Sequence, residues 1–476
     1  MSRFHGVVSR RDFMKTLGLA GASLGAAAAL TAPVFHDLDE LTSSSTVTQI
    51  QPWWVKEVDQ PTEELDWSLI APRPYYATTF NAANVPNATQ LAAQGAANKA
   101  QWLSQNKPGY TLRDQAAANA FSSNISTVKT GVSWAGTATA TPQTMGVAQW
   151  QGTPEENARM LRSVLKLQGS PMVSFLVMDS NARKLIYSDY AFEDVAVGYS
   201  KPSSTKSSLS GTNTISVIPN LQLYGVSNSA PMSNELMKLC PSPTASLGHH
   251  IDHQPAMLGS SLVQNFLIGL GYHGYNDSMV GIGAHPAFKI LSGDGEIGRV
   301  HGQLINPNFG MPMIDNYTLI DLPVAPGKPI DAGFFRFCRT CAKCADVCPS
   351  GAITNDAEPT WDVESTVVNA PGHKQYSNDA VKCQSYFDLV QYCVTCQASC
   401  VFTKKSSAMI HKIVKATVAS TPMFNGFFKK MDSAFGYGNI NFSQSNNPTT
   451  GYFNQDAPLW WDKELPSYNY DMSLPY

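Results

Sequence analysis

Apolar side chains recur at helical spacing between positions 160 and 165, directly after Thr153-Pro154-Glu155-Glu156. This tetrapeptide supplies an N-cap threonine, a proline at the first helical position and a capping-box glutamate. The pattern therefore predicts a helix that begins near Pro154. A second and longer helix is predicted from Pro255 to Leu270, where Gly271 ends the apolar pattern.

Short apolar runs without helical spacing predict strands at 172–178 and 214–218, with 221–226 as a possible continuation, and 235–239 fits a short helix. Alternating helices and strands over residues 151–332 favour a layered domain of the α/β or α+β class. Residues 36–150 are rich in Ala, Asn, Thr and Gln, which predicts an irregular, partly helical segment that wraps this domain. Residues 406–476 are rich in aromatic side chains, so we expect a C-terminal tail packed on the core.

The first 35 residues have the pattern of a targeting sequence. Ser9-Arg10-Arg11-Asp12-Phe13-Met14-Lys15 matches a twin-arginine signal, and a weakly apolar run follows from Thr16 to Leu30. The alternative is a chance arginine pair before an alanine-rich helix. The signal predicts export of the folded chain by the twin-arginine route. No other stretch has the roughly 18 apolar residues of a membrane span, so a membrane-held mature chain would need a separate anchor.

The composition indicates a globular chain with a large core. Its 476 residues are 43% hydrophobic and 14% charged, with a net charge of −3, which suits two or three domains. There is no basic excess, so the sequence predicts no nucleic-acid partner. Eight of the nine cysteines lie between positions 338 and 400, and the ninth, Cys240, is expected to be a small core residue.

Those eight cysteines form two runs with cluster-binding spacing. The runs read Cys338-x2-Cys341-x2-Cys344-x3-Cys348-Pro349 and Cys383-x9-Cys393-x2-Cys396-x3-Cys400. Three thiolates at two-residue gaps wrap one iron–sulfur cube, and the fourth, before a proline, reaches a second cube. The spacing predicts two [4Fe–4S] clusters in a ferredoxin-like module at 333–405. By this crossover rule one cluster takes Cys338, Cys341, Cys344 and Cys400, and the other takes Cys348, Cys383, Cys393 and Cys396.

Zinc sites and disulfides are the alternatives for these cysteines. Structural zinc usually takes two cysteine pairs separated by a longer loop, whereas the first run places four cysteines in eleven residues. A disulfide framework is typical of small secreted domains that lack a core of their own, and this chain is far larger. Both alternatives are therefore disfavoured.

Residues 281–310 form a glycine-rich stretch whose backbone could approach a flat or bulky ligand. It contains Gly293-Asp294-Gly295-Glu296-Ile297-Gly298-Arg299 and Asn306-Pro307-Asn308-Phe309-Gly310. The three glycines have dinucleotide-loop spacing, but no apolar strand precedes them, so that match is weak. We predict cofactor contacts at Gly293, Gly295, Gly298 and Asn306.

These motifs, in this order, resemble the corrinoid-dependent reductive dehalogenases of organohalide-respiring bacteria. Trp53-Trp54, Asp321-Leu322-Pro323 and Lys328-Pro329-Ile330 extend the resemblance over nearly the whole chain. The resemblance implies a nitroreductase-like corrinoid-binding domain at 151–332 that carries the two-cluster module. It also implies a base-off cobamide without a protein histidine ligand, and the sequence has no D-x-H-x-x-G signature.

The resemblance further implies a terminal reductase that cleaves a carbon–halogen bond of a small chlorinated organic substrate, either a chloroethene or a chloroaromatic. The expected partners are a small integral-membrane anchor protein and a respiratory electron-donor complex. The expected place is the outer face of the cytoplasmic membrane, with peripheral attachment.

Three catalytic residues are predicted from the same resemblance. Arg299 is the candidate for a fixed cation that stabilises the leaving halide, and Asn276 is the candidate for a polar helper. The family's proton donor is usually a tyrosine, but its place falls within residues 249–253, where His253 is the closest match. Tyr272 and Tyr275 are the alternatives for this role.

Two other functions remain open at this point. An exported electron-transfer subunit with two clusters would need only about 70 residues for its cluster domain, which leaves most of the chain unexplained. An epoxyqueuosine-reductase-like enzyme would use a corrinoid and two clusters on transfer RNA, but the export signal and the lack of a basic face argue against it.

Overall fold

The structure is a computed structural model that describes residues 51–78, 84–130, 134–197, 216–276, 281–300, 303–311, 313–404, 409–437 and 454–462. The expected signal sequence, residues 1–35, lies outside the described residues, as do residues 438–453 and 463–476 of the expected tail.

A four-stranded antiparallel sheet forms the centre of the larger domain. Its order is β2 (Met172–Val177), β5 (Tyr224–Pro231), β9 (Met313–Ile320) and β6 (Gly274–Tyr275). β5 pairs with β9 along its whole length, from Tyr224 opposite Ile320 to Pro231 opposite Met313. Mixed helices and strands were expected, and this architecture is confirmed. Since every pairing within the sheet is antiparallel, the domain is of the α+β type.

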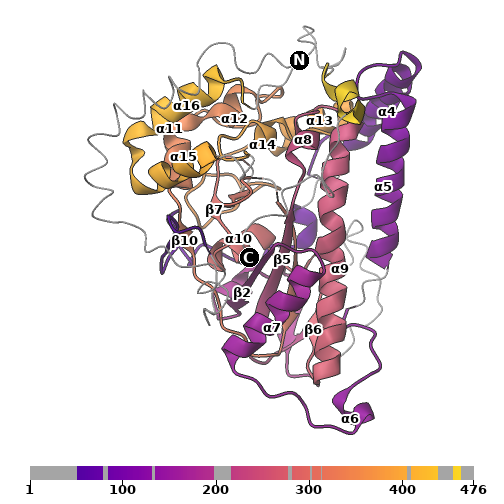
Figure 1. The fold of residues 1–476 in the computed structure, drawn as a ribbon, viewed down its shortest axis with the longest axis vertical. Helices are drawn as coiled ribbons and strands as arrows, with labels where there is room; N and C mark the ends of the chain where they lie inside the picture. Colours follow the sequence, from indigo (N-terminus) through magenta and orange to yellow (C-terminus); the bar gives the residue numbers. More distant parts are fainter. Residues whose placement is uncertain are drawn as a thin grey trace.

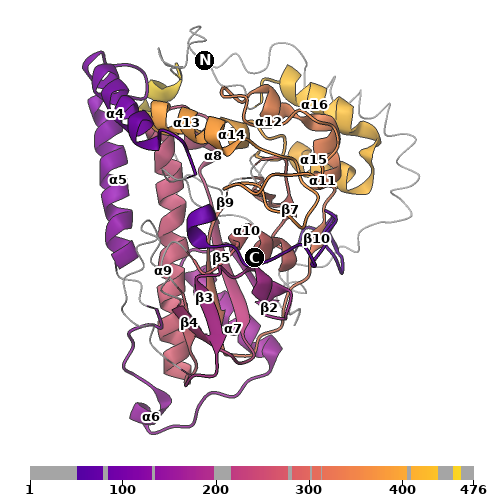
Figure 2. The same cartoon turned by 180° about the vertical axis from the view of Figure 1, so that it is seen from behind.

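Helices cover both faces of this sheet because its strands alternate apolar side chains (Figures 1 and 2). On one face, Val226 and Ile320 pack with residues of α7 (Pro154–Leu167) and α9 (Ser246–Leu270). On the other face, Tyr317 packs against Phe288 of α10 (His285–Leu291), with ring centroids 4.2 Å apart. The parallel pair β3 (Tyr190–Glu193) and β4 (Ser216–Pro219) joins the second face.

The predicted start of α7 is confirmed, whereas that of α9 is wrong. Thr153 and Glu156 form the expected capping box around Pro154, the first residue of the helix. α9 begins at Ser246 and not at Pro255, which lies inside the helix. The proline was interpreted as a start signal, but the turns before it are held by packing against the N-terminal segment and α8 (Asn234–Met237). The helix ends as predicted, with Gly271 in the left-handed conformation at φ 90°.

Much of the expected wrapping segment is more regular than its composition suggests. It contains two long helices, α4 (Ala88–Ser104) and α5 (Leu112–Thr130), which stand beside α9 in Figure 1. α5 packs along α9 and α4 along α13 (Ala380–Val390). The helices therefore connect the sheet domain to the cysteine module. Short elements of this segment are η2 (Tyr75–Thr78) and α6 (Pro142–Met145), whereas η3 (Ala182–Leu185) and η4 (Pro243–Ala245) belong to the sheet domain.

The cysteine module consists of short helices on an aromatic core. They are α11 (Phe334–Cys341), α12 (Lys343–Asp346), α13 and α14 (Thr395–Ala398). Phe402 contacts Phe334 and Phe337, with ring centroids 4.2 and 4.8 Å apart. Two small antiparallel pairs join the module to the rest of the chain: β1 (Lys56–Glu57) with β10 (Ile330–Asp331), and β7 (Glu296–Ile297) with β8 (Leu304–Ile305).

The C-terminal region adds α15 (Met409–Ser420), η6 (Pro422–Phe424), α16 (Asn425–Ala434) and η7 (Ala457–Asp462). In η7, Trp461 Nε1 donates a hydrogen bond to Asp114 Oδ1 at 2.7 Å, and Trp460 packs against a buried core cluster. This part of the tail therefore packs on the core, as expected. Within the described ranges, no helix combines the length and apolarity that crossing a membrane requires.

Candidate functional site

Four cysteines from the two runs line one small cavity. Cys338 and Cys341 lie on α11 and Cys344 lies on α12, while Cys400 comes from the second run. Ala342, between the two helices, takes a left-handed φ of 48° that turns the chain around the cavity. Apolar side chains such as Phe337 complete its wall. We refer to Cys338, Cys341, Cys344 and Cys400 as the first cysteine set.

The remaining four cysteines of the two runs form a second group. Cys383 lies on α13, Cys393 and Cys396 lie at α14, and Cys348 follows α12. The charges of Cys393, Cys383 and Cys348 act on Cys396, and so does that of Cys344, so this group lies together and adjoins the first cysteine set. We refer to Cys348, Cys383, Cys393 and Cys396 as the second cysteine set. The structure thus brings together the two groups of four that the crossover rule predicts.

The chemistry of both sets fits iron–sulfur clusters. All nine cysteines are free of disulfide bonds. Burial raises the pKa of Cys341 to about 11 and that of Cys383 to about 12, and nearby thiolates add to both shifts. Four such thiols would remain protonated at neutral pH unless a cationic centre took the place of their protons. An iron–sulfur core supplies that charge, so each set fits one [4Fe–4S] cluster.

Arg299 lies against the first cysteine set, in the wall of the same cavity. It is 1% exposed, and its Nη2 donates to the Cys338 carbonyl at 2.6 Å. Its Nη1 donates to the carbonyls of Thr354 and Asp356 at 2.8 and 2.7 Å, and the guanidinium stacks 3.9 Å from the Tyr376 ring centroid. The contacts are those of a residue that supports the cluster module. They give no support to the prediction of a cation beside the substrate.

The three glycines that were predicted to contact a cofactor instead approach protein atoms. A Cβ at Gly293 would lie 2.3 Å from the Lys328 carbonyl oxygen, and one at Gly295 would lie 2.5 Å from that of Ile305. A Cβ at Gly298 would lie 3.2 Å from the Ile305 side chain. Close packing of protein on protein therefore explains these glycines, and the sequence argument for a cofactor contact at them loses its basis.

Asn306 is likewise engaged inside the chain. Its Nδ2 donates to the Asp294 carbonyl at 2.6 Å, and its Oδ1 accepts hydrogen bonds from the amides of Asn308 and Phe309 at 2.8 and 3.1 Å. The side chain is fully buried. Asn306 thus holds the turn that ends at Gly310, and this turn packs on Phe402 beside the first cysteine set. Its contacts do not support a cofactor-binding role.

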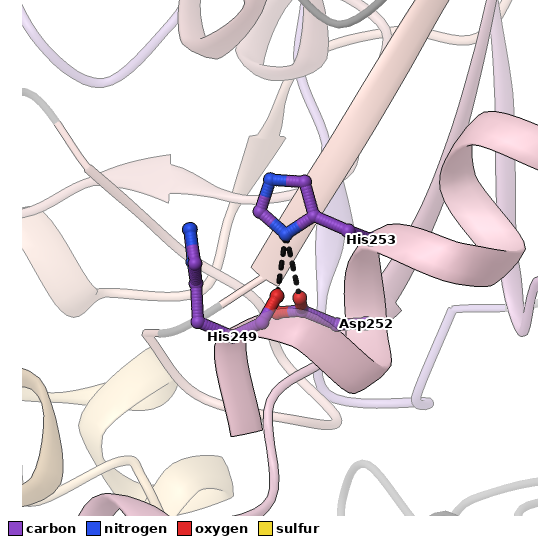
Figure 3. A group of neighbouring side chains, drawn as sticks. All are labelled: His249, Asp252 and His253. Carbon is purple, nitrogen blue, oxygen red and sulfur yellow. Dashed lines mark hydrogen bonds and ion pairs between the residues drawn. The ribbon is translucent and has the colours of Figure 1, made fainter. Parts of the chain in front are cut away.

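His253 lies near the N-terminal end of α9 with Asp252 and His249 (Figure 3). Its Nδ1 is 3.1 Å from Asp252 Oδ1 and also contacts the His249 carbonyl oxygen. Because a carbonyl only accepts, Nδ1 carries the hydrogen, and Nε2 points away from both partners. Burial raises the pKa of Asp252 to about 7, and the hydrogen bond from His253 opposes that shift. The pair has the form of an orienting carboxylate and a proton-carrying imidazole.

Asn276 lies in a buried polar network against the same helix. Its Nδ2 is within 3.0 Å of Ser260 Oγ on α9 and 2.8 Å of Asn316 Oδ1 on β9. Thr318 Oγ1 lies 3.2 Å away. Asn276 is fully buried, and its Oδ1 has no hydrogen-bond partner among the described residues. The predicted helper is therefore held on the α9 face of the sheet, and no direct contact with His253 is seen.

The two alternative tyrosines lie near the other end of α9. Tyr272 donates to the Trp150 carbonyl at 3.0 Å, and Tyr275 is buried in β6 beside Trp134. From His253 to the end of the helix, a rise of 1.5 Å per residue gives roughly 25 Å. The structure thus separates these tyrosines from the site at His253.

Tyr392 is a site residue that the sequence argument missed. Its ring centroid is 5.8 Å from that of His249, and it directly precedes Cys393 of the second cysteine set. Burial raises the pKa of Tyr392 well above its usual value, and the charges of Asp252 and Cys393 add to this shift. Tyr392 therefore lies between the second cysteine set and the His253 region. The signal for it in the sequence is its position directly before Cys393.

Cys240 is also close to the second cysteine set. It is fully buried, and its Sγ accepts a hydrogen bond from the Val394 amide at 3.2 Å. The charge of Cys393 acts on it as well. Its role as a small core residue is confirmed, and that core joins the sheet domain to the cysteine module.

Comparison with protein families identifies both parts of the chain. The family described as "Reductive dehalogenase subunit" matches residues 50–191 and 181–324. The family described as "4Fe-4S double cluster binding domain" matches residues 337–403. The second match contains all eight cysteines of the two sets, so two [4Fe–4S] clusters are the cofactors of this module.

Three solved or curated relatives extend these matches. The chloroethene reductive dehalogenase of Dehalococcoides mccartyi strain VS is 32% identical over 99% of both chains, and the trichloroethene reductive dehalogenase of another strain is 27% identical over 98% of both. A solved reductive dehalogenase, titled as suggesting a mechanism for B12-dependent dehalogenation, is 18% identical with a TM-score of 0.56. That likeness covers 81% of this chain and 49% of the solved one, so this chain spans about half of that protein and shares its fold. On its matched domains and its end-to-end relatives, the chain belongs to the reductive dehalogenase family.

Proposed function

We propose that the protein replaces a chlorine of a chlorinated ethene with hydrogen. The reaction consumes the carbon–chlorine bond, two electrons and one proton, and it yields a carbon–hydrogen bond and chloride. Two curated relatives that match this chain over nearly all of their length bear the names of chloroethene and trichloroethene reductive dehalogenases. Their similarity favours a chloroethene over a chloroaromatic substrate.

One structural observation carries this proposal: an electron source and a proton source meet near the start of α9. The second cysteine set reaches this place through Tyr392, whose ring contacts His249. His249 in turn contacts His253, with ring centroids 4.1 Å apart. A reductive replacement of chlorine needs both supplies at one carbon atom, and the geometry brings them to one end of one helix.

A corrinoid fits the buried polar surface between α9 and the sheet. On this surface, Asn276 Oδ1 and Asn316 Nδ2 are buried and have no hydrogen-bond partners among the described residues. The rim of a corrinoid carries amide groups, which can both donate to and accept from such atoms. When bound, the corrinoid supplies a cobalt centre that exchanges electrons with the carbon–halogen bond. Both its presence and its place in this chain are part of the proposal.

In this mechanism His253 carries the proton and Asp252 sets its direction. The carboxylate and the His249 carbonyl hold the hydrogen of Nδ1, so Nε2 is the atom from which a proton reaches the substrate carbon. Because His253 is only 8% exposed, the proton is delivered in a site that largely excludes water.

Purified protein with its full cofactor content would test this function. We expect a corrinoid absorption band, iron from two clusters, and release of chloride from chloroethenes under a low-potential electron donor. Chlorinated benzoates and phenols serve as the comparison panel, and faster turnover of that panel would contradict the proposed substrate class. Iron–sulfur absorption without a corrinoid would instead indicate an electron-transfer subunit.

We also propose export and membrane attachment. The twin-arginine motif at residues 9–15 supports export, although it lies outside the described residues. The proposed partners are a small integral-membrane anchor and a respiratory electron-donor complex at the outer face of the cytoplasmic membrane. Changing Arg10 and Arg11 to lysine should leave the full-length precursor inside the cell, which fractionation and immunoblotting would measure. Unhindered export of that variant would refute the signal.

A further inference from the structure

Three buried cations surround the first cysteine set. Arg299, Lys343 and Lys404 are 1%, 4% and 8% exposed. Arg299 donates to the Cys338 carbonyl at 2.6 Å, and Lys404 Nζ donates to the Cys400 carbonyl at 2.8 Å. Lys343 lines the same cavity as the four cysteines. We refer to Arg299, Lys343 and Lys404 as the cation cage.

One buried carboxylate partly balances this charge. Asp432 on α16 pairs with Lys343 and lies 3.5 Å from Lys404 Nζ. Three cations and one carboxylate leave a formal charge of +2 on these side chains. Lys415 Nζ donates to the carbonyls of Pro307 and Asn308, which belong to neither cysteine run, so Lys415 is not part of the cage.

The second cysteine set has a different environment. Its sulfur atoms contact neutral groups: the Ala352 amide donates to Cys348 Sγ at 3.4 Å, and Thr395 Oγ1 lies 3.3 Å from Cys393 Sγ. The charged side chain that acts on Cys383 is Asp379, a carboxylate. Lys382 pairs with Asp379 at 3.2 Å, but its side chain is 60% exposed, so water screens its charge.

A [4Fe–4S] cluster held by four thiolates becomes one unit more negative when it takes up an electron. Nearby positive charge stabilises the reduced form, and it does so most strongly where water is excluded. We propose that the cation cage gives the first cluster a higher reduction potential than the second. The first cluster then stores an electron, and the second cluster transfers it onward. This inference concerns the clusters alone and does not depend on the substrate or on the proton donor.

The arrangement gives the two clusters separate tasks. The second cysteine set is the one that reaches α9 through Tyr392, whereas the first set is packed between α11 and the C-terminal helices. An electron that rests on the first cluster remains available after the second cluster has been oxidised. The cage residues therefore act on the redox balance and not on the substrate.

Removal of one charge tests the proposal. In the full-length protein with both clusters loaded, Lys404→Met should lower the reduced-to-oxidised ratio of one cluster at least tenfold at a fixed potential. For a one-electron couple, a tenfold fall in this ratio corresponds to a reduction potential that is 59 mV lower. Redox titration followed by electron paramagnetic resonance measures it, and Cys341→Ser identifies the signal of the first cluster. Lys382→Met, which removes an exposed charge near the second set, should shift neither cluster.

A variant of opposite sign separates charge from structural damage. Asp432→Asn removes the buried negative charge, so it should raise the potential of the same cluster, and Lys404→Arg should leave it nearly unchanged. The proposal is overturned if Lys404→Met and Asp432→Asn shift the first cluster in the same direction, if neither shifts it, or if only the second cluster responds. If one of the two variants loses iron, the other decides. Loss of iron in both would show that the charges are structural and would also overturn it.

Discussion

Tyr392 and His249 bring the cysteine module and the sheet domain into contact, with their ring centroids 5.8 Å apart. One residue precedes a cysteine of the second set, and the other lies one turn before His253 on α9. The contact joins two segments that are distant in the sequence, and it marks where electrons would enter the sheet domain.

Tyr392 contributes through its ring more than through its hydroxyl group. It is buried, and its hydroxyl has no hydrogen-bond partner among the described residues. We expect Tyr392→Phe to unfold at nearly the parental urea concentration, whereas Tyr392→Ala should cost about 3–5 kcal/mol through the cavity it leaves. Equal losses in the two variants would show instead that the hydroxyl group is the important part.

His253→Gln should reduce turnover per bound corrinoid about a hundredfold or more, because a positioned proton donor contributes at least that factor. Iron and corrinoid contents should stay near those of the parent. His250→Gln, on the same helix but outside the hydrogen-bonded pair, is the matched control. If the two variants turn over equally well, His253 is not the proton donor.

Asp252→Asn should have a smaller effect with a characteristic pH dependence. The amide keeps the shape of the side chain but removes its negative charge beside His253. The loss of turnover should therefore be largest above pH 7, where the parental Asp252 is ionised. Since the pKa of Asp252 is about 7, parent and variant should converge at pH values well below 7, where the parental carboxyl group is neutral as well. A uniform loss at every pH would indicate a purely structural role.

The two cysteine sets predict about eight irons per chain. Cys341→Ser should damage the first cluster and leave the second, so iron should fall while part of the visible absorption remains. Cys240→Ser is the control, because Cys240 belongs to neither set although its sulfur accepts a hydrogen bond from Val394. Four irons in the unmodified, fully loaded protein would refute the two-cluster assignment.

Arg299→Ala should lower the stability and iron content of the cysteine module, and any loss of turnover should follow from that. The variant loses three hydrogen bonds from a charged donor, of which the one to the Cys338 carbonyl is buried, and we expect a loss of about 3 kcal/mol or more in unfolding free energy. Iron should fall in parallel with stability. Parental iron together with a hundredfold loss of turnover would instead restore the catalytic role that the sequence predicts.

Glu63 makes stability depend on pH. Burial raises its pKa from 4.5 to about 7, and the charge of Glu296 adds to this shift. Because the folded form binds the proton more tightly, this contribution is complete below pH 4.5 and is lost as the pH rises through about 7. Between pH 5 and 8, Glu63→Gln should therefore lose less stability than the parent, by up to about 3 kcal/mol. Glu64→Gln, whose side chain is 61% exposed, should behave as the parent does.

Local signals in the sequence predicted the elements that depend on local chemistry. The α7 capping box and the glycine that ends α9 are set by residues within one turn of each helix end. The grouping of the eight cysteines also followed from spacing, because the geometry of a cube fixes which thiolates can share it. The start of α9 did not, since its first turns are stabilised by packing against distant segments.

The environment of Arg299 could not be read from neighbouring residues. Its three carbonyl partners lie 39, 55 and 57 residues further along the chain. The same holds for Tyr392 and His249, whose contact depends on how two domains pack. Family resemblance suggests a chemical role for such residues, but only the folded arrangement shows which residues they contact.

The exchange of cysteines between the two runs also has a consequence for assembly. Each cluster takes three ligands from one run and one from the other, so residues 338–348 alone, or residues 383–400 alone, offer an incomplete site to either cluster. If the chain were cut in the connecting segment from Pro349 to Lys382 and one of the two runs were removed, both cluster sites would lose ligands. The two clusters are therefore expected to assemble cooperatively, because binding of one cluster fixes a ligand of the other. A protein that holds one cluster alone is expected to be an unstable intermediate.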